Sequence, residues 1–110
     1  MYFENVYFCT LENGGGTFKN GKTFIKNKGF MVAKKGFEKV FDVKDIKGLK
    51  TALNEYLRFE NCFVGTWLND GKIYLDLSMY VKTLKKAIKL GKENDQLAIY
   101  SFEENDSIYL

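Results

Sequence analysis

Two runs of β-forming residues flank a turn in the middle of the chain, and this pattern constrains the fold more than any other. Residues 62–68 are rich in β-branched and aromatic residues, which is typical of a strand. Asn69-Asp70-Gly71 follows and favours a tight turn. Residues 72–78 then alternate, so that Ile73, Leu75 and Leu77 share one side and Tyr74, Asp76 and Ser78 the other. We therefore predict an antiparallel hairpin with one side against a core.

Two segments have the apolar spacing of helices. Asp45 is a good N-cap residue, and apolar residues recur every three or four positions after it, at Ile46, Leu49, Leu53, Tyr56 and Leu57. A second helix is expected over about residues 81–93, with Asn94 as its C-cap and with one apolar side made of Val81, Leu84, Ala87, Ile88 and Gly91. We expect Trp67 to be buried between the hairpin and the helices, in a core with Leu75, Leu77, Leu84 and Ile88.

Further strands are predicted toward both ends of the chain. Residues 6–11 are β-formers, and the glycines at 14–16 should form a flexible turn after them. Asn20-Gly21 predicts a second hairpin, and strands are also expected at 30–33, 37–41, 96–102 and 107–110. The predicted fold class is α+β, a mostly antiparallel β-sheet with two α-helices packed against it, in the order β-ββ-ββ-α-ββ-α-ββ. With 110 residues, the chain should form a single compact domain, 1–110, with room for one core.

The absence of histidine excludes several kinds of active site, among them Ser-His-Asp and Cys-His catalysis and histidine-ligated metals. Cys9 and Cys62 are too few for a disulfide scaffold or a four-thiolate zinc site, so we expect two buried free thiols. The glycines at 14–16 lead into a predicted hairpin, whereas a phosphate-binding loop leads into a helix. Nothing in the sequence places Asp70 and Asp76 across a cleft as a catalytic pair. We therefore expect no enzymatic activity, no metal and no cofactor.

Lysines are concentrated in two segments of the chain. Residues 17–50 hold ten lysines against three acids, and residues 82–92 hold five lysines and no acid. At 100° per residue, the five lysines fall within about 120° of a helix surface, opposite the apolar side. This pattern is typical of a solvated face, and it also fits a face that docks on an anionic partner. The candidate partner-binding residues are Lys82, Lys85, Lys86, Lys89 and Lys92, together with Lys34 and Lys35 of the first segment.

Aromatic residues are abundant, with ten Phe, seven Tyr and one Trp. Most occupy predicted strand positions, where a core role is the ordinary expectation. The alternative is base stacking on exposed rings between lysines. Phe18, Phe24 and Phe30 interleave with lysines and make the best stretch of this kind, although no RNA-binding aromatic motif occurs.

Several segments resemble small proteins of bacteriophages and mobile elements. They are Phe63-Val64-Gly65-Thr66-Trp67, residues 71–78, residues 87–100 and Gly29-Phe30-Met31-Val32-Ala33. Many small phage proteins without enzymatic motifs inhibit host defences, and anti-CRISPR proteins are among them. The resemblance therefore implies a non-catalytic inhibitor that binds a host defence protein or ribonucleoprotein and occludes its site.

Two other functions stay open at this point. The chain can be a small nucleic-acid-binding accessory protein that uses its lysine-rich segments, or a protein that binds or degrades a defence nucleotide signal. The missing histidine and the single arginine disfavour the last of these. No secretory signal or long apolar run is present, so we expect the bacterial host cytoplasm and no membrane contact. The oligomeric state is not predicted.

Overall fold

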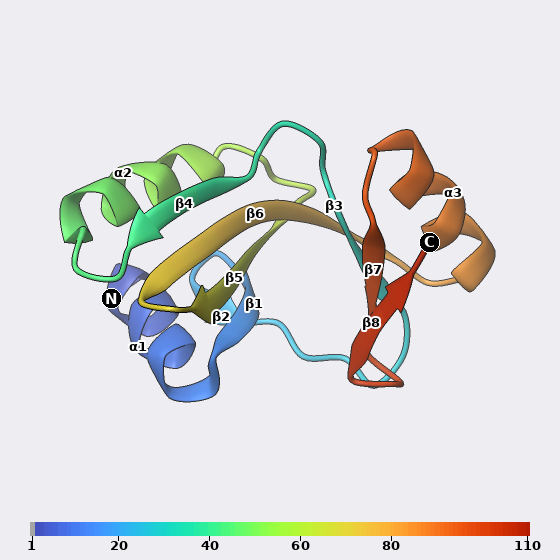
Figure 1. The fold of residues 1–110 in the computed structure, drawn as a ribbon, viewed down its shortest axis with the longest axis horizontal. Coiled ribbons are helices and arrows are strands. Elements are labelled where there is room, and N and C mark those ends of the chain that lie inside the picture. Colours follow the sequence, from blue (N-terminus) through green and yellow to red (C-terminus); the bar gives the residue numbers. More distant parts are fainter. Residues whose placement is uncertain (1) are drawn as a thin grey trace.

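The structure is a computed structural model that describes residues 2–110 and has three helices and eight strands (Figure 1). The helices are α1 (Tyr2–Asn13), α2 (Ile46–Tyr56) and α3 (Leu84–Glu93). The strands are β1 (Gly15–Lys19), β2 (Lys22–Thr23), β3 (Phe30–Ala33), β4 (Lys39–Asp42), β5 (Phe63–Asn69), β6 (Lys72–Val81), β7 (Ala98–Ser101) and β8 (Asp106–Tyr109). Every strand pairing is antiparallel, which confirms the predicted α+β class.

The ten-residue strand β6 organises the sheet. The strands of the sheet lie in the order β2-β1-β5-β6-β3-β7-β8, and β4 also pairs with β6. Along one edge β6 pairs with β5, and along the other it pairs first with β4, at residues 72–75, and then with β3, at residues 78–81. Figure 1 shows β6 arching from a lobe that contains α1 and α2 to a lobe that contains α3.

Both predicted hairpins are present. Asn69 pairs with Lys72, so Asp70 and Gly71 form a two-residue turn, with φ of 53° and 74°. Lys19 pairs with Lys22 around Asn20 and Gly21, which also have positive φ. Positive φ at both central residues is the turn geometry that matches the twist of paired strands.

The N-terminal segment is a helix, and the prediction of a strand at residues 6–11 was wrong. Val6 and Thr10 are spaced four apart and are buried together on the side of α1 that faces the sheet. The Thr10 hydroxyl lies 2.6 Å from that of Thr66, and Tyr7 donates to the Val43 carbonyl at 2.9 Å. These tertiary contacts outweigh the β-propensity of the segment.

The glycines at 14–16 form a helix end and a strand start, where a flexible turn was predicted. Gly14 has φ of 80° and its N–H donates to the Thr10 carbonyl at 2.9 Å, which closes α1. Gly15 and Gly16 belong to β1. A Cβ at Gly15 would lie 2.5 Å from the Thr66 carbonyl oxygen, so glycine permits this close approach of β1 to β5.

The buried residues form two hydrophobic clusters, and the expectation of one core was wrong. The larger cluster joins α1 and α2 to the sheet and is made of Val6, Phe18, Leu49, Ala52, Leu53, Tyr56, Val64, Ile73, Leu75 and Leu77. The smaller one consists of Val32, Ala87 and Ile99 and joins α3 to β3 and β7. Because Val32 pairs with Met79, both clusters lie on the side of β6 that carries the odd-numbered residues. The strand extends beyond the part that α1 and α2 cover, and α3 covers the rest.

Trp67 is 56% exposed and Leu84 is 45% exposed, so the prediction that both are buried was wrong. Trp67 pairs with Tyr74 and therefore shares the side of the sheet opposite Leu75. Leu84 begins α3, one turn before the buried Ala87. Leu75 and Leu77 are buried as predicted, and Ile88 is half-buried against the smaller cluster.

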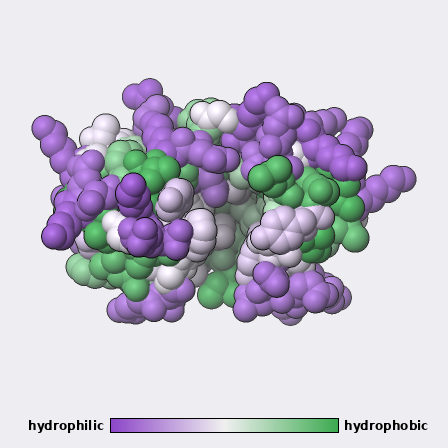
Figure 2. Space-filling view, viewed as in Figure 1, coloured by the Kyte–Doolittle hydropathy of each residue, from purple (hydrophilic) through white to green (hydrophobic). Residues whose placement is uncertain are grey.

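Hydrophilic surface covers most of the outline of the molecule in Figure 2, and apolar surface reaches the outline at both ends of the view. Figure 2 shows apolar and weakly polar surface gathering in the middle of the same view, where the surface is hollowed.

Candidate functional site

Helix α3 presents four of the predicted lysines on a firmly seated element. The Thr83 hydroxyl caps its first turn by accepting from the Lys86 N–H at 3.3 Å, and Asn94 closes the last turn through the Leu90 carbonyl. Ala87 is fully buried, and Gly91 packs where a Cβ would lie 3.0 Å from the Ile99 side chain. This packing fixes the opposite side of α3 toward solvent.

The α3 lysine face consists of Lys85, Lys86, Lys89 and Lys92, and all four are exposed. The ion pairs found within residues 2–110 involve none of them. Glu93 is the one acid on the helix and lies in its last turn. Lys82 is exposed but precedes the helix, which begins at Leu84 and not at residue 81 as predicted. Four unpaired ammonium groups therefore share one helix surface.

The structure places Lys34 and Lys35 close together but gives each a partner of its own. Lys35 donates to Asp95 at 2.5 Å, and its backbone N–H donates to the Asn94 amide at 3.1 Å. The hydrogen bond and the charge of Asp95 raise the pKa of Lys35. The Lys34 ammonium lies over the rings of Phe37 and Phe59, 5.6 and 5.8 Å from their centroids. The segment of Lys34 and Lys35 thus contacts the C-terminal end of α3, and both ammonium groups already interact with other residues of the chain.

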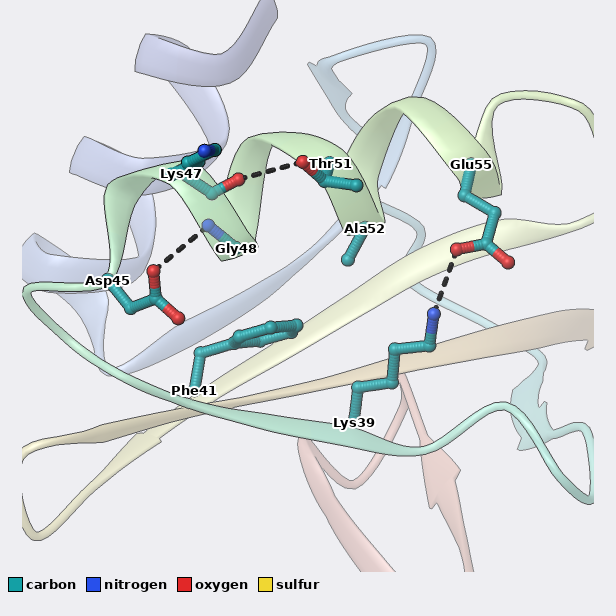
Figure 3. Close-up of a pocket in the computed structure, with 8 residues that line it drawn as sticks. All are labelled: Lys39, Phe41, Asp45, Lys47, Gly48, Thr51, Ala52 and Glu55. Atoms are coloured by element: carbon teal, nitrogen blue, oxygen red, sulfur yellow. Dashed lines mark hydrogen bonds and ion pairs between the residues drawn. The ribbon is translucent and has the colours of Figure 1, made fainter.

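A groove of about 390 Å³ lies between α2 and β4 (Figure 3). Phe41 and Ala52 supply its apolar surface. Its polar groups serve the local fold: Asp45 accepts from the Gly48 N–H at 3.0 Å, as the predicted N-cap. Lys39 pairs with Glu55 at 2.9 Å, and that ion pair lowers the pKa of Glu55. The groove therefore offers little free hydrogen-bonding capacity to a ligand.

The sheet has a second side that no helix of residues 2–110 covers, and the sequence did not point to it as a site. We call it the helix-free face and define it by Phe63, Gly65 and Trp67 of β5 and Tyr74, Asp76, Ser78 and Tyr80 of β6. The Trp67 and Tyr74 rings lie 5.3 Å apart. Asp76 is half-buried at the centre of this face, where burial raises the pKa of its carboxyl group.

An aromatic cluster lies at one end of the helix-free face, where the chain passes from β2 to β3. Phe24 contacts Phe63, Tyr80 and Phe102, with ring centroids 4.3, 5.5 and 6.0 Å apart. Lys19 lies over the Phe63 ring and Lys26 over the Phe24 ring. Phe18 and Phe30, by contrast, pack with the larger and the smaller cluster. The interleaved phenylalanines therefore do not form one stacking platform.

Cys9 and Cys62 are free thiols, and both are half-buried where full burial was expected. No group of three or more Cys, Asp or Glu side chains that could hold a metal occurs among the described residues. Likewise, no helix from residue 2 onward is long and apolar enough to span a membrane.

Comparisons with known protein families, with curated proteins and with solved structures found no match to this chain. The surfaces of the molecule are therefore the structural observations that point to a function.

Proposed function

We propose that this protein is a non-catalytic inhibitor of the phage type, which docks on a host defence ribonucleoprotein and occludes its site. The observation that carries the proposal is the α3 lysine face, four exposed lysines without ion-pair partners among residues 2–110. A ribonucleoprotein offers the anionic surface that such a face complements. The defence context of this proposal is an expectation that comes only from the resemblance of residues 29–33, 63–67, 71–78 and 87–100 to small phage proteins.

The size of the chain is compatible with steric occlusion. Its accessible surface is 7194 Å², so a standard interface of about 800 Å² takes roughly a ninth of it. Lysine is a flexible point charge, which favours electrostatic steering over reading of a base sequence. We therefore expect the lysine face to raise the association rate, and neighbouring residues to provide shape complementarity to the partner.

A matched pair of charge variants tests this function. Lys85→Glu with Lys89→Glu reverses the charge at the centre of the lysine face. Lys44→Glu with Lys47→Glu makes the same charge change on two exposed lysines at the N-terminal end of α2. Each immobilised protein is incubated with ribonucleoprotein complexes purified from defence-carrying bacteria. We expect the α3 variant to bind at least tenfold more weakly than the α2 variant and the unmodified protein. Equal binding by all three would show that the face is only solvated.

A nucleic-acid-binding accessory protein is the second candidate, because Lys19 and Lys26 lie beside the aromatic cluster of Phe24 and Phe63. Gel shifts with single-stranded RNA at 50 and 200 mM salt distinguish the two. Binding to free RNA that weakens steeply with salt, and that resists the α3 substitutions, favours this second function.

A further inference from the structure

Asp76 occupies the middle of the helix-free face. Both carboxylate oxygens lie within 3.0 Å of the position that a Cβ of Gly65 would take, so the carboxyl group rests on the backbone of β5. Gly65 pairs with Asp76 on one side and with Thr17 on the other. Because residue 65 has no side chain, the carboxyl group of Asp76 occupies the space that a Cβ would take.

Aromatic rings lie on both sides of this carboxyl group. Trp67 follows Gly65 by two residues and contacts Tyr74, while Phe63 precedes Gly65 by two residues and contacts Phe24. Phe63 and Trp67 are four residues apart on one strand, which separates them by about 13 Å. The carboxyl group thus lies on the sheet between aromatic side chains, of which Trp67 is the most exposed.

The Asp76 carboxyl group has no cationic partner in the ion pairs of the described residues. The Ser78 hydroxyl donates to Oδ1 at 2.5 Å, and the ion pairs within residues 2–110 do not include Asp76. Burial and the charge of Glu38 both raise the pKa of Asp76. Burial without a cationic partner makes the ionised form of this carboxyl group less stable, and a cation that reached it would stabilise that form.

We propose that this site binds the guanidinium group of an arginine side chain from a partner protein. Guanidinium is planar, so it stacks on the exposed Trp67 ring while its N–H groups point at the Asp76 oxygens. The oxygen that Ser78 leaves free, together with the remaining lone pair of Oδ1, matches two parallel N–H donors. An ammonium group has no flat face to stack on the Trp67 ring, and its N–H donors do not point in parallel at two carboxylate oxygens. The site is separate from the α3 lysine face and does not depend on it.

Small probes test the site directly. Trp67 is the single tryptophan, so its fluorescence reports on the surroundings of Asp76 during titration with N-acetylarginine amide. The neutral N-acetylcitrulline amide has nearly the same shape, and Nα-acetyllysine amide carries the charge without the plane. We expect the arginine probe to bind at least tenfold more tightly than the citrulline probe and more tightly than the lysine probe. Equal binding of the arginine and citrulline probes would overturn the proposal, and tighter binding of the lysine probe would overturn the guanidinium assignment.

Two variants and one control locate the binding. Asp76→Asn keeps an acceptor for Ser78 but loses the charge, and Gly65→Ala puts a methyl group where the carboxyl group rests. Asp70→Asn makes the same chemical change as the first variant in the turn of the same hairpin. We expect at least a tenfold loss of arginine-probe binding for the first two and none for the control. Unchanged binding in either Asp76→Asn or Gly65→Ala, with melting temperature and circular dichroism preserved, would refute the site. Because Gly65→Ala retains Asp76, it keeps the test valid if Asp76→Asn fails to fold.

The same titration separates this inference from the proposed function. The variant with Lys85→Glu and Lys89→Glu should bind the arginine probe as well as the unmodified protein does. A loss in that variant would show that the probe binds elsewhere.

Discussion

Replacing Trp67 by alanine should cost much less stability than replacing a core residue of the same sheet. The side chain is 56% exposed, so under half of the roughly 200 Å² that a tryptophan can bury is removed from water. At about 25 cal/mol per Å² this burial contributes about 2 kcal/mol, which is an upper value because unfolded chains also bury some surface. Leu77 is fully buried, so Leu77→Ala both loses transfer energy and leaves a cavity, at about 3–5 kcal/mol.

Urea unfolding followed by far-ultraviolet circular dichroism measures both losses, since the Trp67 variant has no tryptophan fluorescence. We expect equal m-values and a free-energy loss for Trp67→Ala of no more than about 2 kcal/mol, well below that for Leu77→Ala. A loss for Trp67→Ala that equals or exceeds that for Leu77→Ala would place Trp67 in the core and refute the two-sided description of the sheet.

Three other predictions concern the acid, the glycines and the thiols. Because the native pKa of Asp76 is raised, the stability that its protonated form provides is lost as pH rises from the unfolded value near 4 through the native pKa. The advantage of Asp76→Asn over the unmodified protein in urea unfolding should therefore grow from pH 3 to pH 8, and a shrinking advantage would contradict this. Gly29→Ala should cost more than the roughly 1–2 kcal/mol of Gly71→Ala in thermal unfolding. Both residues have positive φ, but only at Gly29 would a Cβ meet a tyrosine side chain, at 2.4 Å, so equal losses would be evidence against the close packing there. Replacing Cys9 and Cys62 by serine should leave the oligomeric state unchanged, and a disulfide in non-reducing mass analysis would argue otherwise.

The central hairpin shows how far the pattern of a sequence can be read. Its alternation correctly predicted which side of β6 faces the core, through Ile73, Leu75 and Leu77. The two-residue turn at Asp70-Gly71 sets the register that pairs Trp67 with Tyr74. Because Tyr74 was predicted to face outward, the same register implies an outward Trp67. The general tendency of tryptophan toward burial misled the prediction where local geometry was decisive.

The N-terminal helix was beyond local prediction. Its residues favour strands, and its helical state depends on contacts that Thr10 and Tyr7 make with residues far along the chain. The second helix was easier because Asp45 caps it and because Leu49, Leu53 and Tyr56 are buried on one side. Local signals specify an element when they agree with its tertiary contacts.

The two candidate surfaces also differ in how far the local sequence predicts them. The α3 lysine face follows from spacing on one helix, so the sequence was sufficient to predict its exposed arc. The Asp76 site requires three strands in register and a missing side chain at Gly65, and neither is visible in a single segment. Lys34 and Lys35 were selected for charge alone, whereas the structure gives each of them a local partner.

The plating efficiency of a phage on defence-carrying bacteria shows whether the α3 lysine face docks on the defence machinery. Hosts that target the phage are made to express the unmodified protein, the variant with Lys85→Glu and Lys89→Glu, or the control with Lys44→Glu and Lys47→Glu. We expect the unmodified protein and the control to restore plating on at least one such host. The α3 variant should not restore it, although all three proteins are folded and equally abundant. Restoration by the α3 variant to the level of the control would contradict the claim that the α3 lysine face docks on the defence machinery.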